Sequence, residues 1–189
     1  MSNFSQRGPI RPPAAGQRGP ARLASKHSSA DESPGLLLWQ VTNRWQAAQR
    51  AALKPFDLTH VQFVLLATLT WLGDGLITQK QLAQHSATDP MMTSQVLRTL
   101  EERGLICRGR HPTDARARTL SVTSSGAALA NRAIVAVEGC DADFFKPLGH
   151  SSTQFTTQLR ALRQHARRDE RLPRHAAAAA RSTAEGCDP

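Results

Sequence analysis

The stretch DPMMTSQVLRTLEERGLI, residues 89–106, predicts a helix with a sharp start and a sharp end. Asp89 followed by Pro90 is a helix start, because aspartate caps the free backbone N–H groups and proline fits the first helical position. Gly104 supplies a left-handed cap at the other end. We therefore predict a helix from Pro90 to about Arg103, followed by extended chain.

This predicted helix has two different sides when its residues are placed about 100° apart. The apolar side carries Met92, Val96, Leu97 and Leu100. The opposite side carries Ser94, Gln95, Arg98 and Glu102. The outer face is therefore small, polar and cationic.

A shorter helix is predicted just before this one. Thr78 stands three residues before Gln81, the spacing of a capping box, in which the two residues satisfy each other's free N–H groups. Leu82 and Ala83 supply an apolar side, and the pattern runs out around Ser86. The sequence thus predicts two short helices that face each other across a turn.

Two further helices precede this pair. The first begins near Leu36, has apolar residues at steps of three and four, and stops at Pro55. The second starts at another capping box, formed by Thr59 and Gln62, and continues through an apolar run to about Gly73.

The chain after the main helix alternates between apolar residues and arginines, as a β-strand does. This stretch begins at Leu105 and includes Arg108 and Arg110, and residues 111–114 have turn chemistry. A second alternating stretch consists of Arg116, Arg118, Leu120 and Val122. We predict a β-hairpin with cationic residues near its tip. The order helix, turn, helix, hairpin is that of a winged helix-turn-helix domain.

Two helices follow the hairpin. Thr123 caps a long one, which Pro147 and Gly149 end, and Ser151 with Gln154 forms a capping box for the last one. Their apolar residues are Leu129, Ala133, Val137, Cys140 and Phe144, then Phe155, Leu159, Leu162 and Ala166. Together with the first helix, these faces exceed what a winged-helix core of this size needs.

Burial of the excess apolar surface requires a partner, most simply a second copy in a two-fold dimer. The alternative is intramolecular packing of the same helices into one larger bundle. The predicted fold class is mainly α with a small β-hairpin wing: a winged helix-turn-helix domain flanked by dimerisation helices.

The composition narrows the function. The 24 Lys+Arg against 15 Asp+Glu give a net charge of +9, which points to an anionic partner. The longest uncharged run, the 16 residues between Asp57 and Asp74, is too short and too polar to span a bilayer, so we expect no membrane partner. Three widely spaced cysteines and no secretory signal indicate a reducing cytoplasm.

The positive charge is concentrated in the predicted helix and hairpin, with six arginines and three acids between Arg98 and Arg118. A helix fits the major groove of DNA, where Ser94 and Gln95 can hydrogen-bond base edges, and a basic hairpin tip can reach the minor groove. A solvated surface would explain either feature alone. The two together favour binding to double-stranded DNA.

The chain is expected to have three parts. Residues 1–35, rich in Pro, Gly, Arg and Ser, predict a disordered basic arm. An Arg-rich start also occurs in organelle transit peptides, but these prolines and glycines interrupt any amphipathic helix. Residues 36–167 form the folded core, with the DNA-binding lobe at about 57–123, and residues 168–189 form a flexible tail.

Catalytic motifs are absent from the sequence. It contains no Cys-x-x-Cys, His-Glu-x-x-His, Gly-x-Ser-x-Gly or phosphate-binding glycine loop, and its histidines lack metal-ligand spacing. We therefore expect no enzyme activity, no metal site and no cofactor. The remaining alternative is a winged-helix module for protein or RNA contacts, which would not need arginines on both the helix face and the hairpin.

Three motifs follow one another in this chain: Leu-Glu-x-Arg-Gly-Leu-Ile at 100–106, Asp-x-Arg at 114–116 and Leu-x-x-Thr-x-x-Gly at 120–126. With the segments 58–63 and 78–83, they make the chain resemble a transcriptional regulator of the MarR family. The resemblance implies an obligate homodimer on a pseudo-palindromic operator, with half-sites roughly 34 Å apart.

The resemblance also assigns roles to residues. Asp114 would orient Arg116, which would enter the minor groove, while the outer face of the main helix would occupy the major groove and Thr93 would touch a phosphate. The candidate DNA-contacting residues are Thr93, Ser94, Gln95, Arg98, Arg110, Asp114, Arg116 and Arg118.

Members of the family commonly respond to small aromatic ligands or oxidants, with repression relieved by the ligand. The resemblance therefore implies a small aromatic effector. Candidate ligand-binding residues are Trp39, Trp45, His60 and Trp71, although a tryptophan on a helical stripe is commonly a core residue. Oxidant sensing has weaker support, because no cysteine lies near the first helix and Cys107 is better explained as a small strand residue.

Overall fold

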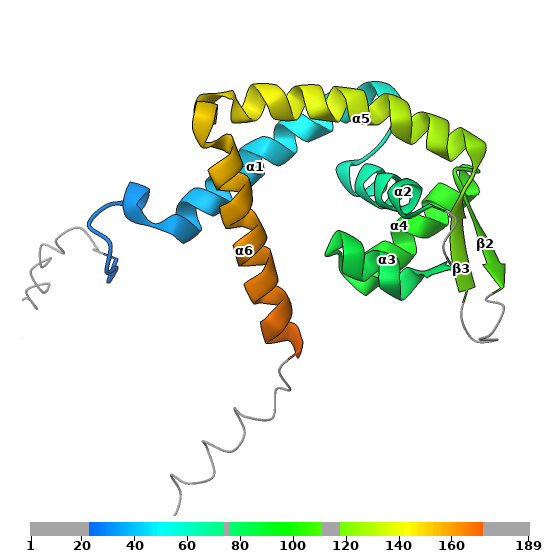
Figure 1. Cartoon of the computed structure of the whole chain (residues 1–189), viewed down its shortest axis with the longest axis horizontal. Helices are drawn as coiled ribbons and strands as arrows, with labels where there is room; N and C mark the ends of the chain where they lie inside the picture. The colour runs from blue at the N-terminus through cyan, green and yellow to red at the C-terminus, as the bar shows by residue number, and fades with distance from the viewer. Residues whose placement is uncertain (1–22, 74–75, 111–117, 172–189) are drawn as a thin grey trace, which may run out of the picture. The chain divides into compact units, whose positions relative to one another are not determined.

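The computed structural model describes residues 23–73, 76–110 and 118–171 (Figure 1). Most of the predicted arm and tail lies outside these residues. In the described part of the chain, no helix combines the length and the apolar character needed to cross a membrane.

The chain divides into two compact units, Met1–Val41 and Thr42–Pro189. The described part of the first unit holds the 3-10 turn η1 (Ala30–Glu32) and the start of helix α1 (Pro34–Leu53). Helix α1 ends within the second unit, just before Pro55, as the sequence predicts.

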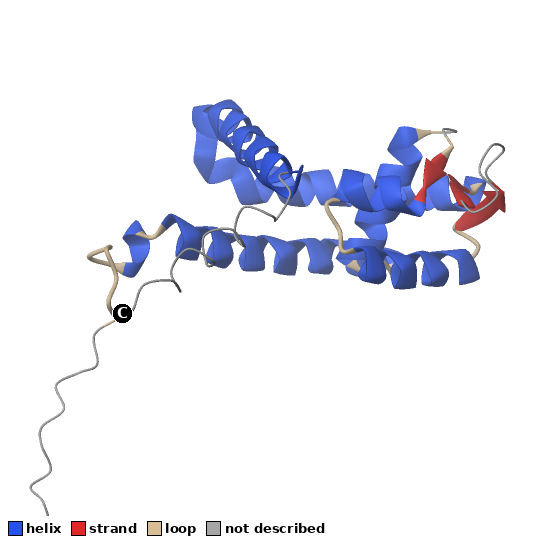
Figure 2. Cartoon of the chain, turned by 90° about the horizontal axis from the view of Figure 1, so that it is seen from below, coloured by secondary structure: helices blue, strands red, loops and turns tan. Residues whose placement is uncertain are grey.

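The second unit is mainly helical, with a small antiparallel sheet (Figure 2). After α1 its elements are η2 (Lys54–Phe56), α2 (His60–Leu72), β1 (Ile77–Thr78), α3 (Gln79–Ser86), α4 (Pro90–Glu102), β2 (Ile106–Arg110), β3 (Arg118–Val122), α5 (Ser124–Phe145), η3 (Lys146–Ser151) and α6 (Ser152–Arg171). The winged helix-turn-helix order is therefore confirmed.

Two of the three predicted capping boxes are present, those of Thr59 with Gln62 and of Thr78 with Gln81. At the start of α2, the Thr59 hydroxyl accepts a hydrogen bond from the backbone N–H of Gln62, and the Gln62 side chain accepts one from the N–H of Thr59. Thr78 and Gln81 repeat the arrangement at the start of α3. These local bonds explain why the sequence locates both helix starts to the residue.

The two ends of α4 also follow the sequence. Asp89 Oδ1 accepts hydrogen bonds from the N–H groups of Met91 and Met92, both at 2.9 Å. At the other end Gly104 has φ +68°, and its N–H donates to the carbonyl of Glu101. The N–H of Leu105 donates to the carbonyl of Leu100, which completes a Schellman motif.

The sheet has the strand order β1-β3-β2, with antiparallel neighbours throughout. Strands β2 and β3 form the predicted hairpin. Strand β1 was not predicted, because two residues are too few to show an alternating pattern. It pairs Ile77 with Leu120 and Thr78 with Thr119, and so attaches the helical part to the wing.

A single apolar core joins α2, α3, α4, the sheet and α5 to the end of α1. Its most deeply buried side chains are Leu53, Leu65, Leu66, Leu69, Leu82, Leu97, Leu100, Ile106 and Leu120, with Ala130 and Ala133 from α5. This core holds the outer face of α4 in a defined orientation relative to the hairpin.

The two helices predicted after the wing are present, but Ser151 belongs to η3, and the described residues show no capping box between Ser151 and Gln154 at the start of α6. Thr123 caps α5, and the helical conformation is interrupted at Gly149, which has φ +50°. The first part of α6 is largely exposed, including Leu159 at 41% and Leu162 at 63%. The apolar face expected on this helix is therefore not covered within the described part of the chain.

Candidate nucleic-acid interface

Helix α4 presents a polar outer face to solvent. Leu97 and Leu100 are fully buried, whereas Gln95 and Arg98 are exposed and Ser94 is half-buried. The predicted division of the helix into two sides is thus confirmed for these residues. Met92, expected on the apolar side, is 39% exposed, so the buried face is narrower than the sequence predicts.

The predicted phosphate contact of Thr93 does not agree with the position of this residue in the structure. Its side chain has an exposed fraction of 0%, and its hydroxyl donates to the carbonyl of Asp89 at 2.7 Å while lying 2.8 Å from the Thr88 hydroxyl. These bonds hold it against the turn between α3 and α4, at the centre of the buried side. A buried hydroxyl with internal partners has no access to a phosphate, so we remove Thr93 from the candidate DNA contacts.

The base of the wing brings two arginines together. Arg110 ends β2, Arg118 begins β3, and the two are directly opposite each other in the antiparallel register. Both are exposed. Opposed residues point to the same face of a hairpin, and like charges in that position repel each other. The pair therefore places two positive charges side by side at the base of the wing. Asp114 and Arg116 lie outside the described residues.

Two other arginines of this region serve the fold. Arg103 donates to the backbone carbonyl of Asp57 at 2.7 Å and lies 3.4 Å from its carboxylate. Arg108 Nε lies 3.0 Å from Glu101 Oε2, which ties the wing to the end of α4. Neither pairing was predicted: Asp57 is 46 residues from Arg103, and the Arg108–Glu101 pair depends on how β2 folds back beside the end of α4.

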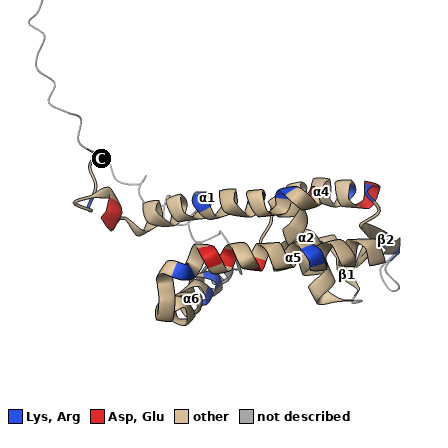
Figure 3. Ribbon diagram, turned by 90° about the horizontal axis from the view of Figure 1, so that it is seen from above, with Lys and Arg blue, Asp and Glu red and all other residues tan. Residues whose placement is uncertain are grey.

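Three acidic residues of the second unit lie together on α5. Figure 3 shows the acidic residues of α5 in its second half, the end away from the wing. These residues are Glu138, Asp141 and Asp143. This cluster lies away from the wing, where Arg110 and Arg118 are exposed, and the distance favours approach of a polyanion to the wing.

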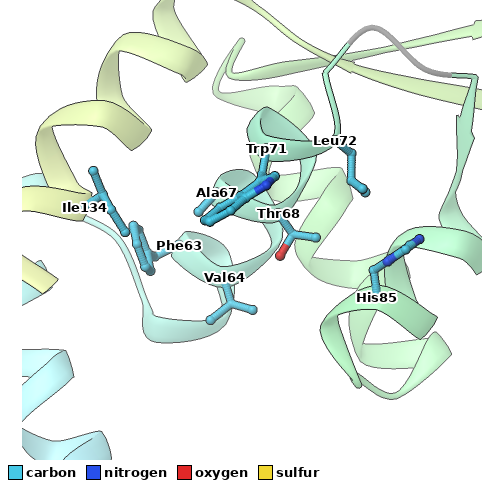
Figure 4. A pocket seen from close by; sticks show the side chains of 8 residues that line it. All are labelled: Phe63, Val64, Ala67, Thr68, Trp71, Leu72, His85 and Ile134. Atoms are coloured by element: carbon cyan, nitrogen blue, oxygen red, sulfur yellow. The ribbon is translucent and has the colours of Figure 1, made fainter. Parts of the chain in front are cut away.

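The candidate ligand-binding residues of the second unit divide between two places, with Trp71 at one and Trp45 and His60 at the other. Trp71 is 90% exposed and borders an open pocket of about 410 Å³ (Figure 4). The pocket is lined by Phe63, Val64, Ala67, Thr68, Trp71, Leu72, His85 and Ile134. Of this lining, only Trp71 was predicted from the sequence, although Phe63, Ala67 and Trp71 recur every four residues on α2. Trp39 belongs to the other unit and is 66% exposed.

Trp45 and His60 lie at a second place, between α1, α2 and α5. Trp45 Nε1 donates to Asp141 Oδ1 at 2.7 Å, and the Trp45 ring meets the His60 ring edge to face at 5.1 Å. Gln49, which is fully buried, donates to the same Asp141 oxygen at 2.6 Å. The bond from Trp45 connects α1 to α5. The bond from Gln49 gives its buried side-chain N–H group an acceptor, which allows a glutamine on the buried side of α1.

Burial lowers the pKa of His60, and the positive charge of Arg50 lowers it further, while the negative charge of Asp141 acts in the opposite direction. The neutral imidazole is therefore the form that the folded protein favours. Burial likewise raises the pKa of the Cys140 thiol, and the acids Asp141 and Asp143 add to this. Cys107 is exposed on β2, with its sulfur 3.0 Å from the Ser121 hydroxyl.

Comparison with known proteins gives consistent results. Residues 58–117 match the model of the MarR family. The uncharacterised HTH-type transcriptional regulator YdcH of Bacillus subtilis (strain 168) is 43% identical over 144 residues, which are 75% of this chain and 97% of that protein.

Two solved structures extend the comparison to the fold. The Mycobacterium tuberculosis MarR family protein Rv2887, in complex with salicylic acid, superposes with a TM-score of 0.57 at 32% identity, over 71% of this chain and 99% of that one. CouR from Rhodococcus jostii RHA1, bound to p-coumaroyl-CoA, gives a TM-score of 0.64 at 25% identity, over 73% of this chain and 94% of that one.

Proposed function

The chain belongs to the MarR family of transcriptional regulators, and we propose that it is a repressor that binds a pseudo-palindromic operator in double-stranded DNA as a homodimer. In this proposal α4 enters the major groove, and the wing contacts the flanking backbone and the minor groove. A small aromatic acid relieves the repression.

The observation that carries the proposal is the combination of α4 and the wing base. Gln95 and Arg98 are exposed on one side of a helix whose other side is fixed by the core. Arg110 and Arg118 are held opposite each other at an unfavourable spacing for two cations. A DNA phosphate between them would turn this repulsion into attraction, and most protein–DNA hydrogen bonds are made to the backbone.

Exposed apolar residues on α6 support the homodimer. Leu159 and Leu162 are one turn apart on α6, and both are exposed. A second copy that covers this face in a two-fold arrangement would place two α4 helices for two half-sites, which a pseudo-palindrome requires.

The pocket beside Trp71 supports an aromatic effector. Its lining is almost entirely apolar, with Trp71 on one side and His85 of α3 on the other (Figure 4). An aromatic ring could pack against the indole, and its carboxylate could approach the imidazole. The relatives bound to salicylic acid and p-coumaroyl-CoA carry ligands with an aromatic ring. Because α3 is one of the two helices of the DNA-binding motif, a ligand in this pocket could shift that motif relative to α2.

The proposal is tested with DNA from the region flanking the protein's own gene, in a gel-shift or anisotropy assay. Specific binding should weaken steeply with salt, because each neutralised phosphate releases counterions. Arg98→Ala and Arg116→Ala should each weaken binding by about 1 to 3 kcal/mol. Lys146→Ala removes an equal charge outside the proposed interface and should leave affinity nearly unchanged.

Equal losses of affinity for Lys146→Ala and Arg98→Ala would show that binding depends on the net charge of the protein and not on contacts made by Arg98. A folded protein that fails to bind any duplex would favour the alternative, a winged-helix module for protein or RNA contacts.

A further inference from the structure

One apolar side chain lies in the middle of the polar face of α4. Met91 is 82% exposed, the highest value of any large apolar residue on this helix. Steps of four, three and four residues lead from Met91 to Gln95, Arg98 and Glu102, so these four share one stripe. Thr93, with the buried leucines of α4, lies on the opposite side.

The backbone at this position is firmly held. The N–H of Met91 donates to the carboxylate of Asp89 at 2.9 Å, and Pro90 fixes the first helical residue. The cap therefore fixes the backbone of Met91 and the direction of its Cα–Cβ bond, while the side-chain torsions beyond Cβ can still rotate. A flexible, polarizable methionine can fit closely against a small apolar group.

We propose that Met91 determines operator specificity by packing against the C5-methyl group of a thymine in the major groove. This inference rests on the proposed function, in which the start of α4 meets base edges, as the first residues of recognition helices do. The thymine methyl is the apolar group that base pairs present in the major groove. Arg98 lies on the same stripe as Met91 and is exposed, so its positive charge is available to a DNA phosphate, while Glu102 lies at the far end of the stripe.

Gln95 adds a constraint on the operator. It lies one turn after Met91, and one helical turn spans about 5.4 Å, or one to two base-pair steps of about 3.4 Å. Glutamine pairs well with the edge of adenine. Each half-site should therefore contain two neighbouring A·T pairs, one read through adenine by Gln95 and one through thymine by Met91.

The test replaces single thymines by uracil, which pairs identically but lacks the methyl group. The operator is first located by footprinting with the full chain, and each thymine of one half-site is then replaced in turn. Wild-type protein should bind one of these DNAs about three- to fivefold more weakly, the equivalent of one buried methyl group. Met91→Ala should bind the thymine and uracil versions of that DNA equally.

Met92→Ala is the matched control: this residue is also exposed, but it lies about 100° away around the helix, so the variant should keep the wild-type preference for thymine. Alanine favours helix, and unchanged circular dichroism will show that both variants fold. If Met91→Ala discriminates uracil as strongly as wild type, or if no thymine matters to wild type, the inference fails while the proposed function stands. If wild type binds no specific duplex, both fail.

Discussion

Gly126 lies where the wing returns to α5. A Cβ atom at this position would overlap the carbonyl oxygen of Leu105 and lie 2.9 Å from its carbonyl carbon. Beside it, the Thr123 hydroxyl accepts from the N–H of Gly126 and donates to the carbonyl of Gly104 at 2.8 Å. The motif Leu-x-x-Thr-x-x-Gly is therefore a structural element that joins the end of α4 to the start of α5.

Gly126→Ala should lower the free energy of unfolding by about 1 to 3 kcal/mol, because the added methyl group forces backbone to move in a packed region. Urea unfolding at a fixed protein concentration measures the change. Gly139→Ala is the control: it is an exposed position inside the same helix with no atom near the new Cβ, and it should stabilise by about 0.5 to 1 kcal/mol. Equal effects of the two substitutions would contradict the close contact at Gly126.

His60 predicts a pH dependence. Its pKa is lowered in the folded state, so the unfolded chain binds the proton more readily. Its contribution to stability is complete above the unfolded pKa, near 6.5, and is lost as the pH falls through the lower, folded value. His60→Gln should make stability less sensitive to pH below about 6.5, as measured by urea unfolding at several pH values. A variant with the wild-type slope would assign the dependence to other groups.

Among the elements, the hairpin has the clearest conflict between stability and binding. Its two strands place Arg110 and Arg118 opposite each other, although opposite charges or apolar pairs would stabilise a hairpin better. Such a local conflict is expected where residues are retained for function.

Arg118→Ala should therefore have two opposite effects. Without DNA it should raise the free energy of unfolding by a few tenths of a kcal/mol, about the size of a cross-strand repulsion. With operator DNA it should lower affinity and reduce the salt dependence. Urea unfolding and anisotropy measure the two quantities on one preparation. Arg108→Ala is the contrast, because it removes the ion pair with Glu101 and should not stabilise. A less stable Arg118→Ala protein would refute the repulsion.

At the scale of the whole molecule, α6 bears on assembly. Its exposed leucines are available to a second copy, and the operator geometry proposed for α4 needs two copies.

Leu159→Glu should shift the protein toward monomer and weaken operator binding together, because a charge at the interface must be desolvated without a partner. Sedimentation at several concentrations measures the first effect and anisotropy the second. Gln164→Glu makes the same charge change at a polar, exposed position of α6 and should leave both unchanged. A dimer unaffected by Leu159→Glu would move the interface away from this face.

The element order and most helix ends follow from local features of the sequence. The capping boxes at Thr59 and Thr78, the Asp89-Pro90 start and the Gly104 end depend on groups within a few residues, so they can be read locally. The outer face of α4 follows from its period in the same way, which is why Gln95 and Arg98 were predicted to be exposed.

Which polar residues are buried, and which candidate residues share a site, depends on contacts between elements that are distant in the sequence. Gln49 and Trp45 are fixed by Asp141, which is 92 and 96 residues away along the chain, and no local pattern reports such a bond. Thr93 is buried because its hydroxyl finds partners in the turn before α4. The separation of Trp71 from Trp45 depends on how α2 packs against α3 and α5, since helices place side chains by packing as well as by period.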